Sequence, residues 1–136
     1  MKAPATMDEA ARLKALRHYQ ILDTPPEPAF DDLSRLAAHA CGTPIALVSL
    51  VDENRLWFKS KVGLTATEVP REISFCAQAI LHSDLFIIPD TAADERYADN
   101  PLVISSPGVR FYAGASLVTP DGHALGAGPA STKPAP

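Results

Sequence analysis

A run of almost entirely apolar residues, PIALVSLVD at positions 44–52, constrains the fold of this chain more than any other segment. Apolar side chains occupy both alternating faces of the run, whereas a strand with one solvated face would alternate apolar and polar positions. The run therefore predicts a central strand that is buried on both sides. After a polar turn, basic and apolar residues alternate in RLWFKSKVG at 55–63, which predicts a hairpin whose lysines lie on an outer strand.

Two helices are predicted before this hairpin. Thr6 and Glu9 have the spacing of a capping box, so a first helix is expected over about 7–19. Pro28 suits the first turn of a second helix, and Gly42 is placed to end it as a left-handed cap. The apolar face of this second helix is predicted to consist of Phe30, Leu33, Ala37, Ala40 and Cys41.

The rest of the chain alternates short helices and strands. Ser74 can cap a third helix in FCAQAILHS, which precedes a short strand in LFIIPD, a loop over 91–103 and a longer strand in VRFYAGASLVT. This order fits an α+β fold, in which helices are segregated against an antiparallel sheet. We expect one domain over 1–126 and a disordered Pro/Ala-rich tail, AGPASTKPAP, over 127–136.

The composition excludes several classes of function. The 136 residues include 16 acidic and 12 basic ones, so no basic field is available for nucleic acid. No apolar run approaches the roughly 20 residues that span a bilayer, and a cytoplasmic location without membrane contact is expected. The four histidines are scattered, and the sequence has no phosphate loop and no nucleophile–base pair. We therefore expect no metal, no cofactor and no enzymatic activity.

Four blocks of the sequence resemble one known family, and they stand in that family's order and spacing. The blocks are the segment from RLKALRHYQ to FKSKVGL at 12–64, PREISFCAQAIL at 70–81, DERYADNPLV at 94–103 and VRFYAGASLVTPDGHALG at 109–126. They are similar to the GAF domains found at the N-terminus of bacterial sensor histidine kinases and diguanylate cyclases. The resemblance implies a PAS-related antiparallel sheet with helices packed on one face. A small-molecule pocket on the other face would be covered by loops and short helices.

The resemblance also implies a role in signal transduction. A GAF-type sensory domain is expected to bind an unknown small molecule, or to form a homodimer through its terminal helices. Either event would control an output domain, such as a histidine kinase of a two-component system or a diguanylate cyclase in cyclic-di-GMP signalling. Relatives continue after the segment that matches HALG into an apolar last strand in the middle of the sheet. Prolines replace the apolar strand pattern here, so we expect a truncated chain that lacks the last central strand. Such a chain is expected to be only marginally stable, because the neighbouring strand edges stay unpaired. Its output domain is expected to be lost or to be supplied by another polypeptide.

The resemblance points to a set of residues that line or cover the pocket, because aromatic walls with a few polar groups suit a small planar ligand. A purely structural role is the alternative for each of them. Phe75 could only fill the core, Asp94 could only cap a turn, and Asn100 could only fix a loop. The predicted ligand-binding residues are Phe75, Cys76, Asp94, Arg96, Tyr97, Asn100, Phe111 and Tyr112.

The two cysteines support an alternative function. Cys76 lies near the start of a helix, where the amide dipoles can lower the pKa of a thiol. The chain could then be a small redox enzyme on a GAF scaffold, with Cys76 as the nucleophile and Cys41 as the resolving thiol. Related domains include bilin-attaching photosensors and free methionine sulfoxide reductases, but the multi-cysteine motif of the reductases is absent here. Two buried, free thiols are the structural alternative.

Overall fold

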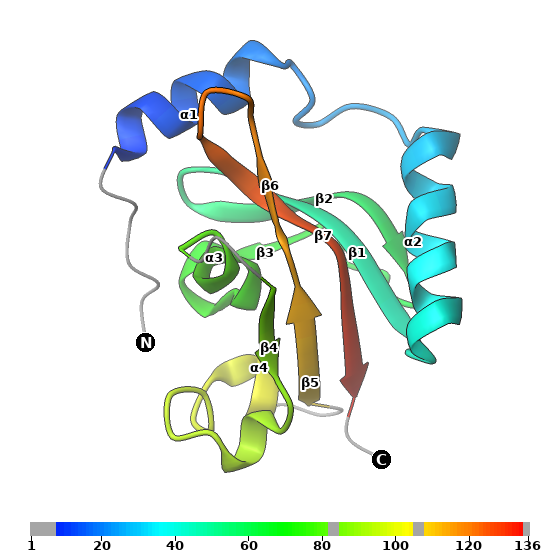
Figure 1. The fold of residues 1–136 in the computed structure, drawn as a ribbon. Coiled ribbons are helices and arrows are strands. Elements are labelled where there is room, and N and C mark those ends of the chain that lie inside the picture. The colour runs from blue at the N-terminus through cyan, green and yellow to red at the C-terminus, as the bar shows by residue number, and fades with distance from the viewer. Residues whose placement is uncertain (1–7, 82–84, 105–107, 135–136) are drawn as a thin grey trace.

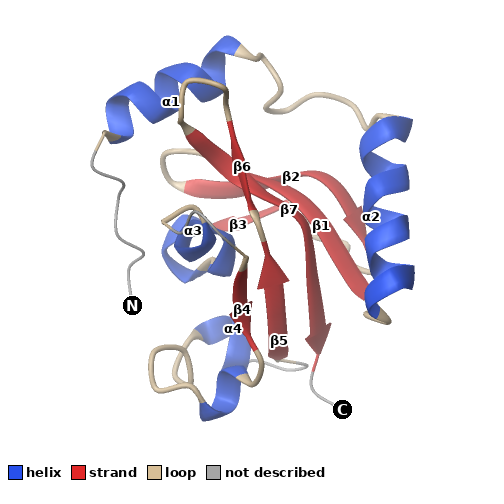
Figure 2. Cartoon of the chain, in the orientation of Figure 1, coloured by secondary structure: helices blue, strands red, loops and turns tan. Residues whose placement is uncertain are grey.

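The computed structural model describes residues 8–81, 85–104 and 108–134, and its centre is a seven-stranded antiparallel sheet (Figures 1 and 2). The strand order is β3-β2-β1-β7-β5-β4, and β6 pairs with β7. The strands are β1 (Ile45–Val51), β2 (Arg55–Val62), β3 (Glu68–Pro70), β4 (Phe86–Ile88), β5 (Val109–Gly114), β6 (Ser116–Val118) and β7 (Ala124–Pro134). The predicted α+β class, with an antiparallel sheet, is confirmed.

Helices lie on both sides of this sheet (Figure 1). The longer helices α1 (Glu9–His18) and α2 (Pro28–Cys41) lie on one side, and α2 packs against β1, β2 and β7. The short helices α3 (Phe75–Ala79) and α4 (Pro101–Ile104) lie on the other side, with the 3₁₀ turns η1 (Arg71–Ile73) and η2 (Thr91–Ala93). None of the helices in the described ranges is long and apolar enough to cross a membrane.

Strand β1 is buried on both faces, as its sequence predicts. Leu47 and Val51 belong to the larger core beneath α3, and Leu50 packs with Trp57 and with Leu16 of α1. All residues of β1 after its first are buried. The two cores therefore lie on opposite faces of one strand, with α1 packed on one side and α3 on the other.

The ends of α2 agree with the sequence, whereas its predicted apolar face is wrong. Pro28 begins the helix, and Gly42 ends it in the left-handed conformation with φ 63°. Ser34 is the buried residue that faces the sheet, and its hydroxyl accepts a hydrogen bond of 2.7 Å from Ser60 on β2. Leu33, by contrast, is 48% exposed. Ala40 and Cys41 are exposed as well, while Phe30 and Ala37 are half-buried.

The prediction of an outer strand holds for only part of β2, because β3 pairs with its first three residues, Arg55–Trp57, and not with the part that carries Lys59 and Lys61. The register of β1 with β2 shifts where Lys59 is inserted as a bulge, and Lys59 is buried. Its ammonium group donates hydrogen bonds of 2.7 Å to the Thr24 hydroxyl and to the Pro25 carbonyl oxygen, and it forms an ion pair with Glu27. The lysine thus fastens the segment between α1 and α2 to the sheet.

The predicted loss of the last central strand is wrong. Strand β7 occupies the middle of the sheet, where it pairs with β1 on one side and with β5 and β6 on the other. The predicted disordered tail over 127–136 is therefore a strand as far as Pro134, and residues 135–136 lie outside the described part of the chain. Strands β1 and β5 therefore each pair with β7 on the edge that was predicted to be unpaired.

The position of the prolines explains why this strand is compatible with the sheet. The register of β1 with β7 shifts between the Leu47–Ala130 and Ser49–Ala127 pairs, so Pro129 falls at an irregularity where a ladder donor is not needed. Small residues are required beside it. A Cβ at Gly128 would lie 3.0 Å from the Val48 Cα, so β1 would have to shift to accept a side chain there.

We predict that Gly128→Val destabilises the protein by about 1–3 kcal/mol, because the added side chain must displace the backbone of β1. Thermal and urea unfolding of the purified variant measure this change. Lys133→Val is the matched control, since Lys133 is an exposed residue of the same strand. Equal stability of the two variants would contradict the tight packing of β7, because a disordered tail tolerates both substitutions.

Candidate functional site

A buried aromatic cluster lies on the α3 side of the sheet. Phe75 of α3, Phe86 of β4, Tyr97 of the following loop and Tyr112 of β5 are each less than 7% exposed. Their ring centroids lie 5.5–6.3 Å apart, in edge-to-face and tilted contacts that aromatic rings favour. Three of these residues were predicted to line the pocket, and the structure brings them together in a closed cluster.

Cys76 adjoins this cluster in an environment that suppresses thiol chemistry. Its side chain is buried, and the Tyr112 hydroxyl donates a hydrogen bond of 3.1 Å to its sulfur. Burial raises the pKa of the Cys76 thiol, despite its place in the first turn of α3. Burial likewise raises the pKa of Tyr112. The neutral thiol therefore acts as a small apolar residue in the core.

The predicted pairing of Cys76 with Cys41 is not favoured by the fold. Cys41 is exposed at the end of α2, which corrects its predicted burial, and α2 and α3 lie on opposite sides of the sheet (Figure 1). A resolving thiol must approach the nucleophile to within disulfide geometry, with Cα atoms at most about 7 Å apart. The intervening sheet separates the two cysteines in the described structure.

The polar residues predicted to cover the pocket chiefly hold their own loop in place. Asp94 accepts hydrogen bonds from the Arg96 backbone amide and guanidinium, and Arg96 stacks over Tyr97 at 5.0 Å from its ring centroid. The Asn100 side chain donates to the Ile73 carbonyl oxygen and accepts from the Leu102 amide. These contacts place the loop against η1 and over the aromatic cluster, and the structural alternative accounts for each of them.

Phe111 is separated from the other predicted pocket residues. It is adjacent to Tyr112 on β5, and successive side chains of a strand point to opposite faces of the sheet. Its ring is half-buried and lies 5.9 Å from the ammonium group of Lys133 on β7. The aromatic cluster therefore includes Tyr112 but excludes Phe111.

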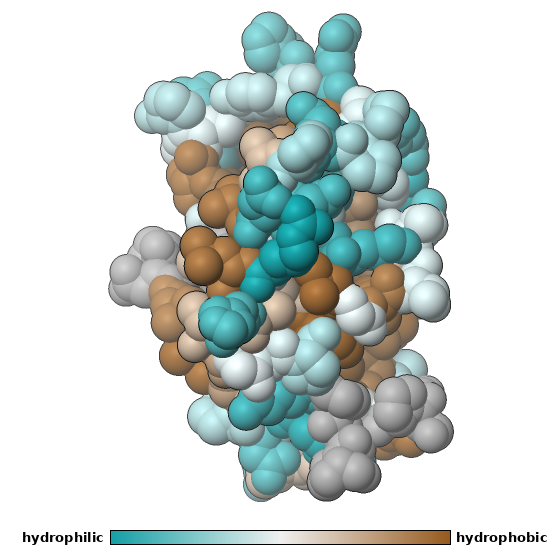
Figure 3. Space-filling view, turned by 90° about the vertical axis from the view of Figure 1, so that its right-hand side faces the viewer, coloured by the Kyte–Doolittle hydropathy of each residue, from teal (hydrophilic) through white to brown (hydrophobic). Residues whose placement is uncertain are grey.

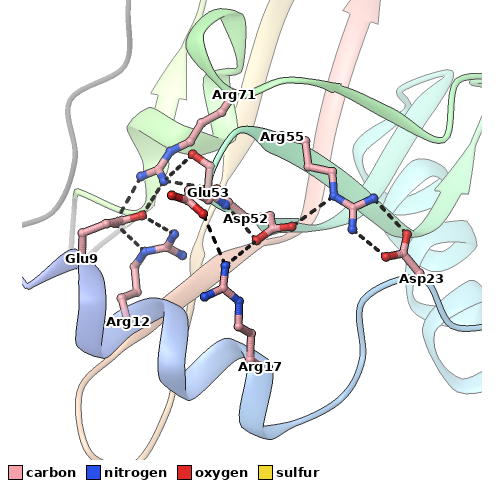
Figure 4. Close-up of polar contacts among 8 residues, drawn as sticks. All are labelled: Glu9, Arg12, Arg17, Asp23, Asp52, Glu53, Arg55 and Arg71. Atoms are coloured by element: carbon pink, nitrogen blue, oxygen red, sulfur yellow. Dashed lines mark hydrogen bonds and ion pairs between the residues drawn. The ribbon is translucent and has the colours of Figure 1, made fainter.

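A chain of charged side chains, which the sequence analysis did not identify as functional, links α1 to the α3 side of the sheet (Figure 4). Glu9 accepts two hydrogen bonds of 2.9 Å from Arg12 and one of 2.5 Å from Arg71. Arg71 also donates to the Asp52 carbonyl oxygen at 3.1 Å. Because Arg71 opens η1, which leads directly into α3, this contact joins α1 to the segment that carries Phe75 and Cys76.

The same chain of charges extends along the β1–β2 turn. Arg55 forms ion pairs with Asp23, Asp52 and Glu68, and Arg17 of α1 lies 3.8 Å from Asp52. The sequence contained one signal for this arrangement. Arg12 occupies a position on the buried side of α1 with Leu13 and Leu16, and a buried arginine requires a charged partner.

Three open hollows on the described surface lie away from the aromatic cluster. One of about 610 Å³ lies between α1 and the β6–β7 turn, lined in part by Ala11, Ala15 and His123. The others, of about 380 and 330 Å³, lie beside Arg17 and Arg55 and beside Trp57 and Lys59. Within the described ranges, no group of three His, Cys, Asp or Glu side chains could hold a metal ion.

Comparisons with known proteins agree with this geometry. The family model for the GAF domain matches residues 25–127. Over 123 residues the chain is 39% identical to a cyclic di-GMP phosphodiesterase of Pseudomonas aeruginosa, an alignment that covers 90% of this chain and 21% of the relative. The chain thus spans only about a fifth of the length of that curated relative.

Solved structures with low sequence identity share the fold. The GAF domain of a phosphoenolpyruvate-protein phosphotransferase from Coxiella burnetii has a TM-score of 0.61 at 12% identity, covering 93% of this chain and 78% of that one. The free methionine-R-sulfoxide reductase of Neisseria meningitidis has a TM-score of 0.59 at 19% identity, covering 96% and 77%. At such identities the likeness establishes the fold alone.

The fold and the matches define an α+β domain of the regulatory or sensory class. The chain belongs to the GAF domain family, and it is homologous to the GAF domain of a cyclic di-GMP phosphodiesterase. The family resemblance found in the sequence is thereby confirmed.

We predict that the two cysteines differ sharply in reactivity. A thiol reagent should modify exposed Cys41 rapidly, whereas buried Cys76 should react only when urea unfolds the protein. The reagent cannot reach Cys76 in the folded state, and the raised pKa of this thiol leaves little of the reactive thiolate. Absorbance of the released chromophore measures the two phases, and Cys41→Ser should remove the fast one. Rapid modification of Cys76 in folded Cys41→Ser protein would revive the redox-enzyme alternative.

We predict that Glu9→Gln destabilises the protein by roughly 1.5–3 kcal/mol at pH 7, because the buried arginines lose a charged acceptor. The hydrogen bonds from Arg12, followed by those from Arg71, hold the pKa of Glu9 far below its ordinary value of 4.5. A lowered folded-state pKa stabilises the protein above the unfolded value, and this contribution is lost as the pH falls below 4.5.

Urea unfolding at a series of pH values tests this prediction. The difference in stability between the native protein and Glu9→Gln should shrink from pH 5 downward. Glu72→Gln is the matched control, because Glu72 is an exposed carboxylate beside Arg71. A difference that does not change with pH would assign the effect to packing and not to the charge of Glu9.

Proposed function

We propose that this GAF domain is a signal-input module that binds a small molecule or pairs with another copy, and so controls an output domain that turns over cyclic di-GMP. The 39% identity to a cyclic di-GMP phosphodiesterase supports this kind of output. A diguanylate cyclase or a histidine kinase is the output suggested by the sequence resemblance. We further propose that the chain itself has no enzymatic activity, in keeping with the buried, protonated thiol of Cys76.

The contact between Glu9 and Arg71 carries the proposal. It joins α1, at the N-terminal end of the described chain, to η1 and thus to the first residues of α3. A ligand that enters between the aromatic rings must displace some of them, because Phe75, Tyr97 and Tyr112 fill the space between α3 and β5. Movement of α3 would pull on Arg71, and Arg71 would shift α1 through the carboxylate of Glu9.

Such coupling requires two arrangements of the same contacts that differ in ligand affinity. The closed cluster is one arrangement. A second, with the loop over 94–100 lifted and α3 displaced, would open a site between aromatic walls. The local hydrogen bonds of Asp94 and Asn100 hold that loop in place and would break or move with it.

A chimeric enzyme tests the regulatory role directly. The region of the Pseudomonas aeruginosa phosphodiesterase that aligns with this chain is replaced by this chain, and hydrolysis of cyclic di-GMP is measured. The chimera should differ severalfold in rate from the phosphodiesterase lacking the region. Glu9→Gln in the chimera should move the rate toward that of the shortened enzyme, because the link from α1 to α3 is weakened.

The matched control in the chimera is Glu72→Gln, an exposed carboxylate next to Arg71. Identical rates for the chimera, its Glu9→Gln variant and the shortened enzyme would contradict the proposed coupling.

Amide NMR spectra of the isolated domain with cyclic nucleotides and small metabolites provide the ligand test. Shifts confined to residues around Phe75, Tyr97 and Tyr112 would identify the binding site, whereas shifts elsewhere would exclude the aromatic cluster.

A further inference from the structure

The hollow between α1 and the β6–β7 turn, here called the α1 hollow, has one wall from each of these two elements. Figure 1 shows the turn beside α1, and the Arg12 guanidinium of α1 donates a hydrogen bond of 3.4 Å to the Ala124 carbonyl oxygen at the start of β7. The surface at this end of the molecule, the top of Figure 3, is largely hydrophilic. A space of about 610 Å³ therefore lies between two elements that are tied together, away from the aromatic cluster.

Two alanines of α1 create this space. Ala11, Lys14, Ala15 and His18 line the α1 hollow, and their spacing of three or four residues places them on one side of the helix. Ala11 and Ala15 are short, whereas Lys14 and His18 are long and exposed. The helix therefore offers a shallow apolar floor that is bordered by one ammonium group and one imidazole ring.

Lys14 supplies a positive charge that the described residues leave uncompensated. Its ammonium group has no hydrogen-bond or ion-pair partner among the residues that the structure describes. Arg17 also lines the hollow, but its guanidinium forms ion pairs with Asp52 at 3.8 Å and with Glu53 at 3.5 Å. Lys14 is therefore the cation that a ligand in the α1 hollow can engage most readily.

The turn contributes one carboxylate and one imidazole to the opposite wall. The Thr119 hydroxyl donates a hydrogen bond to Asp121, which holds the pKa of Asp121 below its ordinary value. The Asp121 carboxylate lies 3.7 Å from the His123 ring nitrogen, and Asp121 is the only acidic residue among the described residues that line the hollow. Lys14 and Arg17 outnumber this one negative charge, so the lining is positive even when its histidines are neutral.

These groups suit a phosphate that carries an aromatic ring. A lysine acts on phosphate oxygens as a point charge, and His18 and His123 can each donate a ring N–H from opposite walls. Tyr19 also lines the hollow, and its ring is 53% exposed and free of any covering element in the described chain. The volume falls within the roughly 300–1,000 Å³ of small-molecule sites.

We propose that the α1 hollow binds a mononucleotide, with the phosphate held by Lys14, His18 and His123 and the base stacked on Tyr19. The site is separate from the aromatic cluster, and the inference does not depend on the proposed signalling role.

Isothermal titration calorimetry with adenosine 5′-monophosphate, between about 10 μM and 5 mM, tests the site. The nucleotide should bind about tenfold more tightly than inorganic phosphate, which lacks the stacking base, and about tenfold more tightly than adenosine, which lacks the charge. Amide NMR shifts should concentrate in α1 and in residues 119–123.

Charge variants give the test a sign. Lys14→Gln should weaken nucleotide binding about fivefold, and Asp121→Asn should strengthen it severalfold, because the two changes shift the charge of the hollow in opposite directions. Lys133→Gln is the matched control, since Lys133 is an exposed lysine of β7 outside the hollow and should leave the affinity unchanged.

Four results would overturn the proposed site. They are the absence of binding at 5 mM nucleotide, an affinity that Lys14→Gln leaves unchanged, inorganic phosphate that binds as tightly as the nucleotide, and amide shifts confined to Phe75, Tyr97 and Tyr112. The last result would place the nucleotide in the aromatic cluster and would leave the proposed signalling role intact.

Discussion

The rest of the structure depends on the insertion of β7 between β1 and β5. These two strands are separated by more than 50 residues along the chain, and no direct pairing between them is found in the described sheet. Strand β7 supplies hydrogen bonds to both, and its buried alanines complete the core beneath α3. Because small residues occupy its centre, the neighbouring backbones can approach closely. The two halves of the sheet thereby become one layer, against which the four helices of the described ranges pack.

This arrangement places a tightly packed aromatic cluster next to a linked set of charges. Ring contacts close the cluster between α3, the loop that carries Tyr97, and the strands β4 and β5 of the sheet. The charges belong to α1, the β1–β2 turn and η1, which meet at one end of β1 (Figure 4). The proposed signalling role requires a connection from this cluster to another part of the domain. Arg71 belongs to the linked charges and lies four residues before Phe75 of the cluster.

Much of the fold was predictable because local chemistry determined it. Pro28 and Gly42 mark the two ends of α2, and the apolar run at 44–52 defines a strand buried on both faces. Predictions failed where a residue's role depends on distant neighbours. Lys59 is buried because a loop from before α2 surrounds its ammonium group, and β7 is ordered because its proline falls at a register shift. Adjacent Phe111 and Tyr112 divide between the two faces of β5, which the family resemblance did not separate.

The attachment of α1 has a mechanical consequence of its own. Only Leu13 and Leu16 contribute buried apolar side chains from this helix, whereas Arg12 and Glu9 hold it through charge-assisted hydrogen bonds. Leu16 also packs against Leu50 and Trp57, so releasing the helix would expose apolar surface of the sheet to water. The ion pairs of Glu9 with Arg12 and Arg71 are largely buried, and dissolved salt screens such pairs much less than exposed ones. We therefore expect α1 to move together with the β1–β2 turn and not to detach from it.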